Sequence, residues 1–234
     1  MNNNFNFQSF LFISPKKIII SVNDEFTFEE LYKKENTIKN DINEISFEYI
    51  NKFLDENILK IEKKLNSFIE KIILIVDSDD FIPIEISVKK QNHNQLLTQE
   101  SLKYSLNEAK DECKKNFEEK KIVHMLINNY IIDNNKYSSL PKNKICNNFS
   151  LDIKFICIPI NLIKKFEETL KRYQISINRI VSAGYVLNFF SQNEHSIIRN
   201  AKDIINGCNE NEVRFINKAH KNIGFFEKFF KLFG

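Results

Sequence analysis

Glycine is scarce in this sequence, and its scarcity argues against one large class of function. The chain has only four glycines, at positions 184, 207, 224 and 234, and they form no glycine-rich loop. A phosphate-binding loop needs backbone amides close to the ligand, and glycine permits that close approach. We therefore expect neither nucleotide hydrolysis nor a bound cofactor.

Cysteine is equally sparse and shows no pairing pattern. The chain has four cysteines, which lack the C-x-x-C spacing of a zinc site: Cys113, Cys146, Cys157 and Cys208. Neither a metal site nor a disulfide framework is indicated. A reducing cytoplasm is the expected compartment.

The sequence also lacks a recognisable catalytic set. Its four histidines are far apart, and none is paired with a cysteine or an aspartate: His93, His124, His195 and His220. His124 lies in the apolar run "KIVHMLI", which favours a packed histidine. The acidic run "DSDD" at 77–80 follows a predicted strand and reads as a solvated turn. We predict that the protein is not an enzyme, with an enzyme that uses an unrecognised pocket as the alternative.

Long apolar runs and an excess of one charge are missing as well. No run approaches the roughly 20 residues that span a bilayer, and the start "MNNNFNFQSF" does not resemble a signal peptide. The formal net charge is only +3, and the charges are mixed along the chain. This distribution argues against a nucleic-acid partner.

What the sequence does contain is an interleaved series of strands and helices. "FLFIS" (10–14) and "KIIISV" (17–22) predict a hairpin around Pro15, and "TFEE" (27–30) has the capping-box spacing of a short helix. Residues 45–69 have apolar residues at helical spacing, with a possible break, and "KIILIVD" (71–77) predicts a buried strand.

A second series follows. We expect a strand at 83–90, a helix at 98–117, one bent strand or two at 121–133 and another strand at 149–160. A helix at 160–173 and a strand with the start of a helix at 176–190 complete it. This order predicts an α/β or α+β fold. Residues 191–222 are polar and read mainly as a linker, with one short helix plausible around "SIIRNAKDII".

Two segments of this second series match a known pattern: "KIVHMLINNYIIDNNKYSSLP" (121–141) and "FSLDIKFICIPINLIKKFEETLKRYQISINRIVSAGYVLNFF" (149–190). They resemble the bacterial cell-division protein FtsA, an actin homologue. Ten positions match the family pattern: Val123, His124, Tyr130, Ile132, Asp133, Pro141, Ile177, Ile180, Ala183 and Gly184. In that family the region contains a strand–helix–strand–strand module inserted into an actin-like fold.

The resemblance implies a partial actin-like (ribonuclease-H-like) first half. It implies a first-subdomain remnant at 1–80, the inserted module at 81–175 and a return to the first subdomain at 176–190. A linker at 191–222 and a terminal helix at 223–234 would follow. The first phosphate loop of the family is replaced by "LFISPKK", with Phe12 and Ser14 at its Asp and Gly positions. The second phosphate loop and the second half are missing, so ATP binding is not implied.

A non-enzymatic adaptor of the division machinery is the function that the resemblance implies. Its partners would be copies of itself or downstream membrane division proteins, and direct binding of the tubulin homologue FtsZ is doubtful without the second half. The alternative is a platform similar to PilM, which serves pilus or secretion assembly and binds a peptide of a membrane partner.

The last twelve residues, "IGFFEKFFKLFG", predict an amphipathic helix. One face of a helical wheel is apolar: Ile223, Phe225, Phe226, Phe229, Phe230, Leu232 and Phe233. Lys221, Lys228 and Lys231 supply basic charge. Such a helix is typical of an interfacial anchor on anionic lipid at the cytoplasmic face of the inner membrane, here at the division site. The alternative is a terminal helix packed on the protein's own core.

Overall fold

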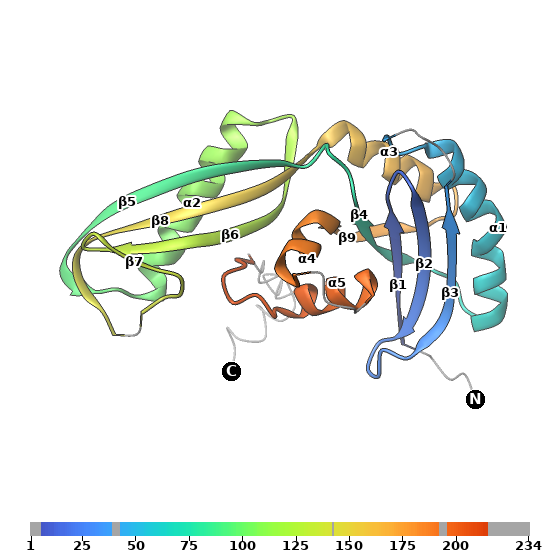
Figure 1. The fold of residues 1–234 in the computed structure, drawn as a ribbon, viewed down its shortest axis with the longest axis horizontal. Coiled ribbons are helices and arrows are strands. Elements are labelled where there is room, and N and C mark those ends of the chain that lie inside the picture. The colour runs from blue at the N-terminus through green and yellow to red at the C-terminus, as the bar shows by residue number, and fades with distance from the viewer. Residues whose placement is uncertain (1–5, 39–42, 142, 192–195, 215–234) are drawn as a thin grey trace, which may run out of the picture.

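The computed structural model describes residues 6–38, 43–141, 143–191 and 196–214, and it contains two sheets (Figure 1). The first sheet has the strand order β3-β2-β1-β4-β9, in which β1, β4 and β9 are parallel and β1, β2 and β3 form an antiparallel meander. Its strands are β1 (Phe7–Ile13), β2 (Lys17–Asp24), β3 (Glu30–Thr37), β4 (Lys71–Val76) and β9 (Ser176–Ser182).

Helices cover both faces of this sheet, which explains its nearly continuous apolar strands. α1 (Phe47–Leu65) and α3 (Ile160–Lys171) pack on one face, against residues such as Leu11 and Leu74. α4 (Ala183–Phe189) and α5 (Ile197–Asn206) pack on the other face, against Phe10 and Ile75.

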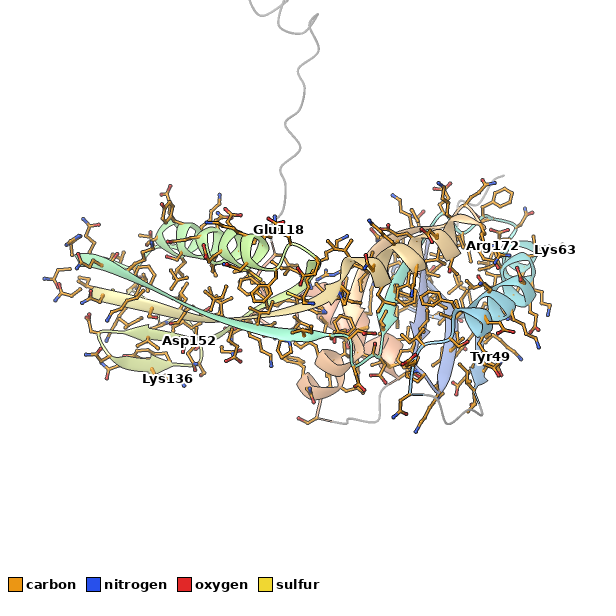
Figure 2. All side chains as sticks on the ribbon, turned by 90° about the horizontal axis from the view of Figure 1, so that it is seen from above. Tyr49, Lys63, Glu118, Lys136, Asp152 and Arg172 are labelled. Carbon is orange, nitrogen blue, oxygen red and sulfur yellow. The ribbon has the colours of Figure 1, made fainter. Side chains whose placement is uncertain are left out.

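The second sheet is inserted between β4 and α3 and extends to one side of the first sheet (Figure 1). Its strand order is β5-β8-β6-β7, and α2 (Gln99–Asn116) packs on one face. The strands are β5 (Ile82–Leu96), β6 (Lys120–Ile132), β7 (Asn135–Tyr137) and β8 (Ile145–Pro159). We call β5–β8 with α2 the module; its polar face carries Asp152, and β7 carries Lys136 (Figure 2).

The predicted α+β class is confirmed, and the inserted strand–helix–strand–strand module is present with the short strand β7 in addition. The segment 121–133 is one strand with two register irregularities rather than two strands. The helix at 160–173 lies outside the module, because Ile163, Phe166 and Leu170 pack into the core of the first sheet.

The short helix predicted at "TFEE" is wrong, since this stretch is a turn leading into β3. The Asp24 carboxylate accepts from the backbone N–H groups of Phe26 and Thr27, and the Thr27 hydroxyl accepts from Glu29 N–H. The Thr27 side chain therefore closes a turn instead of capping a helix. The predicted helix at 45–69 is also shorter and unbroken, because Asn66 ends α1 in a left-handed conformation with φ 51°.

The polar segment 191–222 is not mainly a linker in its described part, 196–214, and the short helix expected around "SIIRNAKDII" is confirmed as α5. α5 buries Ile198, Ala201 and Ile204 against the first sheet. Ser196 caps its start, and Gly207 ends it with φ 91°. Residues 211–213 then return to the edge of β6. Within the described residues, no helix is long and apolar enough to cross a membrane.

Candidate binding cleft between the module and the first sheet

A cleft of about 890 Å³ lies where the module meets the core of the first sheet. The second half of α2, the start of β6 and the N-terminal half of α3 form its walls, together with Arg179 of β9 and residues 212–214. Glu118, which follows α2, marks this region in Figure 2. The cleft therefore combines segments that are far apart in the sequence.

The cleft has an apolar lining and a basic rim. Its apolar side chains are Ile122, Val123, Met125, Ile160, Ile163 and Val213. Its charged side chains are Lys110, Lys114, Lys120, Lys121, Lys164, Arg179 and Arg214, with Glu118, Glu167 and Glu212 as the carboxylates. Burial and the nearby Lys114 charge lower the pKa of Lys110, as expected where cations crowd. The lining thus favours a ligand that has both apolar and acidic groups.

An irregularity in β6 shapes the cleft wall. The register with β8 shifts between Ile122 and His124, so Val123 is an extra residue on the β6 side. As a result Ile122 packs toward the module core, while Val123 packs toward the core of the first sheet. The shift lets neighbouring residues of one strand join the two cores beside the cleft.

A buried polar network adjoins this wall, with His124 at its centre. The His124 side chain is 0% exposed; its Nε2 accepts from Ser182 N–H at 3.0 Å, and its Nδ1 lies 2.9 Å from Glu212 Oε1. Because Nε2 is an acceptor, the proton of a neutral ring is on Nδ1 and is donated to Glu212. His124 thereby links β6 of the module, the end of β9 and residues 211–214, which we call the C-terminal segment.

Glu212 is the shared acceptor of the network, and its side chain is 2% exposed. Arg179 lies 3.2 Å and Arg214 3.7 Å from its carboxylate, and the Tyr185 hydroxyl lies at 3.5 Å. Burial opposes its ionisation, but His124 and the two arginines outweigh burial and lower the pKa of Glu212. Burial lowers the pKa of His124 despite Glu212, so a neutral histidine faces an ionised glutamate. We name His124, Glu212, Arg179 and Arg214 the junction network.

Backbone hydrogen bonds hold the C-terminal segment on the edge of β6. Ile127 N–H donates to Asn211 O at 2.9 Å, and Val213 N–H donates to Met125 O at 2.8 Å. Arg214 also donates to the carbonyls of Ile204 and Ile205 at the end of α5. The segment therefore ties the module to α5 and completes one side of the cleft.

The structure tests only part of the sequence-based site predictions. His124 is packed, as expected. "DSDD" is a turn in which the Ser78 hydroxyl donates to the Asp80 carboxylate at 2.7 Å and accepts from Asp80 N–H at 3.1 Å. The proposed membrane-binding residues from Lys221 to Phe233, together with His220 and His195, lie outside the described residues. Glu212 and the cleft were not predicted, because nothing in the sequence around Glu212 indicates that it approaches His124.

The described residues provide no assembled metal site. They contain no group of three or more His, Cys, Asp and Glu side chains that could hold a metal ion. Cys113, Cys146 and Cys157 are buried free thiols, and Cys208 is an exposed one. Burial and the neighbouring Cys113 raise the pKa of Cys157 to about 12, so it is not a reactive thiolate near neutral pH.

Comparison with known proteins gives distant likenesses only. No family model matches the sequence, and no curated protein is found as a relative. Among solved structures, the PilM–PilN type IV pilus biogenesis complex has a TM-score of 0.45 at 8% identity, covering 78% of this chain and 49% of that chain.

Two further structures have lower scores. A Bacteroides thetaiotaomicron protein with an actin-like ATPase fold and unknown function has a TM-score of 0.36 at 14% identity, covering 80% of this chain and 56% of that one. The cytoplasmic domain of EpsL, an inner membrane component of the type II secretion system of Vibrio cholerae, has a TM-score of 0.34 at 11% identity, covering 77% and 57%. This chain thus matches about half the length of each.

Proposed function

We propose that this chain is a non-enzymatic, membrane-associated adaptor of the bacterial division machinery, and that the cleft binds a short segment of a partner protein. The observation that carries the proposal is the cleft itself, with its apolar lining and basic rim at the junction of two cores. Binding sites for small ligands and short segments are typically concave and largely apolar, with a few polar groups that orient the ligand.

The charge of the rim specifies the partner's chemistry. Seven cationic side chains line the cleft against three carboxylates, and Glu212 already faces Arg179 and Arg214 inside the junction network. The lysines of the lining come from α2, β6 and α3. We infer that the partner segment carries apolar side chains for the lining and carboxylates for the lysines.

The junction network supports a cleft that is formed before the partner arrives. It connects β6, β9 and the C-terminal segment through buried groups. A preformed site avoids the cost of ordering its walls on binding. The module would then form one wall of the cleft in a fixed position.

The turn after β1 supports the part of the proposal that the chain does not bind ATP. Ser14 N–H donates to Lys17 O at 2.8 Å, Lys17 N–H donates to Ser14 O, and the Ser14 hydroxyl donates to Lys17 O. In a phosphate loop such amides would point at the ligand. Here two of these amides, those of Ser14 and Lys17, donate to carbonyl groups within the tight β1–β2 turn.

Membrane association is the part of the proposal that depends on the terminal sequence. In a helix, the sequence of residues 223–233 would place its apolar side chains on one face and lysines on and beside the other. At about 1.5 Å per residue such a helix would be about 16 Å long, too short to cross a bilayer core of about 30 Å. We propose that it lies in the interface of the inner membrane at the division site.

A two-hybrid assay in bacteria would test the adaptor role with the full chain. The prey proteins would be the cytoplasmic segments of membrane proteins encoded beside this gene. We expect an interaction that the double change Lys121→Glu, Lys164→Glu abolishes, because it reverses two rim charges. The matched control is Lys60→Glu, Lys63→Glu on the exposed face of α1. An interaction lost equally in both variants, or kept in both, would contradict binding in the cleft.

The identity of the interacting segment would separate the division role from the alternative. A division protein that binds only through the intact cleft would support the function proposed here. A pilus or secretion component that binds in the same way would assign the adaptor to that assembly. Either partner would test the cleft, and only the first would support the division role.

A further inference from the structure

A second apolar groove lies at the opposite end of α3 from the cleft. It has a volume of about 520 Å³ and is bordered by the second half of α1, the turn after it and the residues that follow α3. We call it the α1–α3 groove. Arg172 and Lys63 mark this side of the molecule in Figure 2, and the carboxylate of Asp55 links the two helices by accepting from the Tyr173 hydroxyl at 2.6 Å.

The groove has large apolar side chains exposed to solvent at its rim and buried apolar side chains at its base. Leu54, Ile58 and Ile69 are buried at its base. Leu59 is 64% exposed and Phe68 is 77% exposed at its rim. Two large exposed apolar residues over an apolar base are typical of a contact surface.

The charge of the groove is opposite to that of the cleft. Its charged lining consists of Asp55, Glu62 and Glu70 with Arg172 as the one cation. The cleft at the other end of α3 is strongly basic. An apolar segment with basic residues would therefore fit the groove and be repelled by the cleft.

The chain itself contains such a segment. Residues 215–234 have four lysines and one glutamate, and seven of the residues from Ile223 to Phe233 would share one apolar face in a helix. Eight residues, 215–222, separate this face from Arg214 at the cleft, and an extended chain of that length reaches about 28 Å. The 12 residues of α3, which span the distance between cleft and groove, are about 18 Å long.

We propose that residues 223–234 bind in the α1–α3 groove of their own chain when no membrane is available. Leu59 and Phe68 would contact the apolar face, and Glu62 and Glu70 would face Lys228 and Lys231. The segment would then have two competing partners, the groove and lipid. This inference goes beyond the adaptor function and sets the conditions under which the protein reaches the membrane.

Photo-crosslinking in the full chain would test the contact directly. Benzoylphenylalanine would replace Phe229, and cross-linked peptides would be mapped by mass spectrometry without lipid. We expect intramolecular cross-links to residues 54–70 or 172–174, lost in the double variant Leu59→Ser, Phe68→Ser. They should remain in the control Tyr104→Ser, which removes a 70% exposed aromatic residue from α2. Cross-links elsewhere, none at all, or cross-links that join two chains would overturn the proposal.

Liposome co-sedimentation would test the competition. If the segment occupies the groove half of the time, freeing it raises the apparent affinity for anionic vesicles about twofold. The Leu59→Ser, Phe68→Ser variant should show this rise at limiting lipid, and Tyr104→Ser should match the unchanged protein. An unchanged or lower bound fraction in the double variant would overturn the competition. The outcome is independent of whether any partner binds in the cleft.

Discussion

Removing the Glu212 carboxylate should destabilise the protein strongly, because three elements meet at this group. In Glu212→Ala the Nδ1–H of His124 loses its acceptor at a site where the ring is 0% exposed. Arg179, 26% exposed, loses the carboxylate at 3.2 Å, while Arg214 keeps the two carbonyls at the end of α5. The change thus leaves one buried donor and one half-buried charge without their partner.

The size of the effect follows from the burial of these groups. Breaking a buried ion pair by removing one partner costs about 3–5 kcal/mol. For a chain of this size, 1 kcal/mol corresponds to a shift of about 2–4 °C in the melting temperature, so Glu212→Ala should lower Tm by roughly 6–20 °C. Glu212→Gln keeps an oxygen that accepts from His124 but loses the charge, and its cost should be about 1.5–3 kcal/mol.

Urea unfolding followed by circular dichroism, with thermal melts in parallel, would measure both variants. The control is Glu210→Ala, an exposed glutamate two residues away, which should change stability by less than about 0.5 kcal/mol. If Glu212→Ala unfolded at the same urea concentration as Glu210→Ala, the junction network would not hold the module and the first sheet together.

Three further results are expected. Burial lowers the pKa of His124 below 6.5 in the folded protein, so below about pH 6.5 the unfolded histidine gains a proton first and the free energy of unfolding should fall. The pKa of Glu212 is also lowered on folding, so this carboxylate should extend the loss of stability below its ordinary pKa of 4.5. His124→Asn should remove the first phase in urea titrations at pH 7.5 and 5.5, and an identical decline in both proteins would contradict this. Co-sedimentation with anionic liposomes should be lost in Phe229→Glu, Phe230→Glu and on truncation after Asn222; if both forms sediment like the full chain, the segment is not an anchor. Millimolar Mg-ATP should leave Tm unchanged, and a clear rise would reveal a nucleotide site.

Local sequence patterns determined much of the first sheet and the module. Strands such as β4 contain unbroken apolar residues because helices cover both faces of the sheet, and this pattern is visible without the structure. The helical spacing in α1 and α3 likewise predicted that these segments are helices, although Phe68, an apolar residue of the predicted 45–69 helix, lies beyond the end of α1 and is 77% exposed. The "TFEE" error shows the limit of local reasoning, since Thr27 has the same hydrogen-bonding ability in a helix cap and in the Asp24 turn.

By itself the sequence determined the α+β class, the order of most elements and the apolar and charged character of its final residues. These properties depend on the spacing of neighbouring side chains. The tertiary structure alone decided the cleft, the α1–α3 groove and the junction network, in which His124 and Glu212 meet across 88 positions. Most residues of the segment 196–214 are polar, and only a few apolar residues, such as Ile198 and Ile204, pack it against the rest of the fold. The sequence does not show that this segment packs on α4, β1 and the edge of β6, because contacts between distant parts of the chain leave no periodic pattern in it.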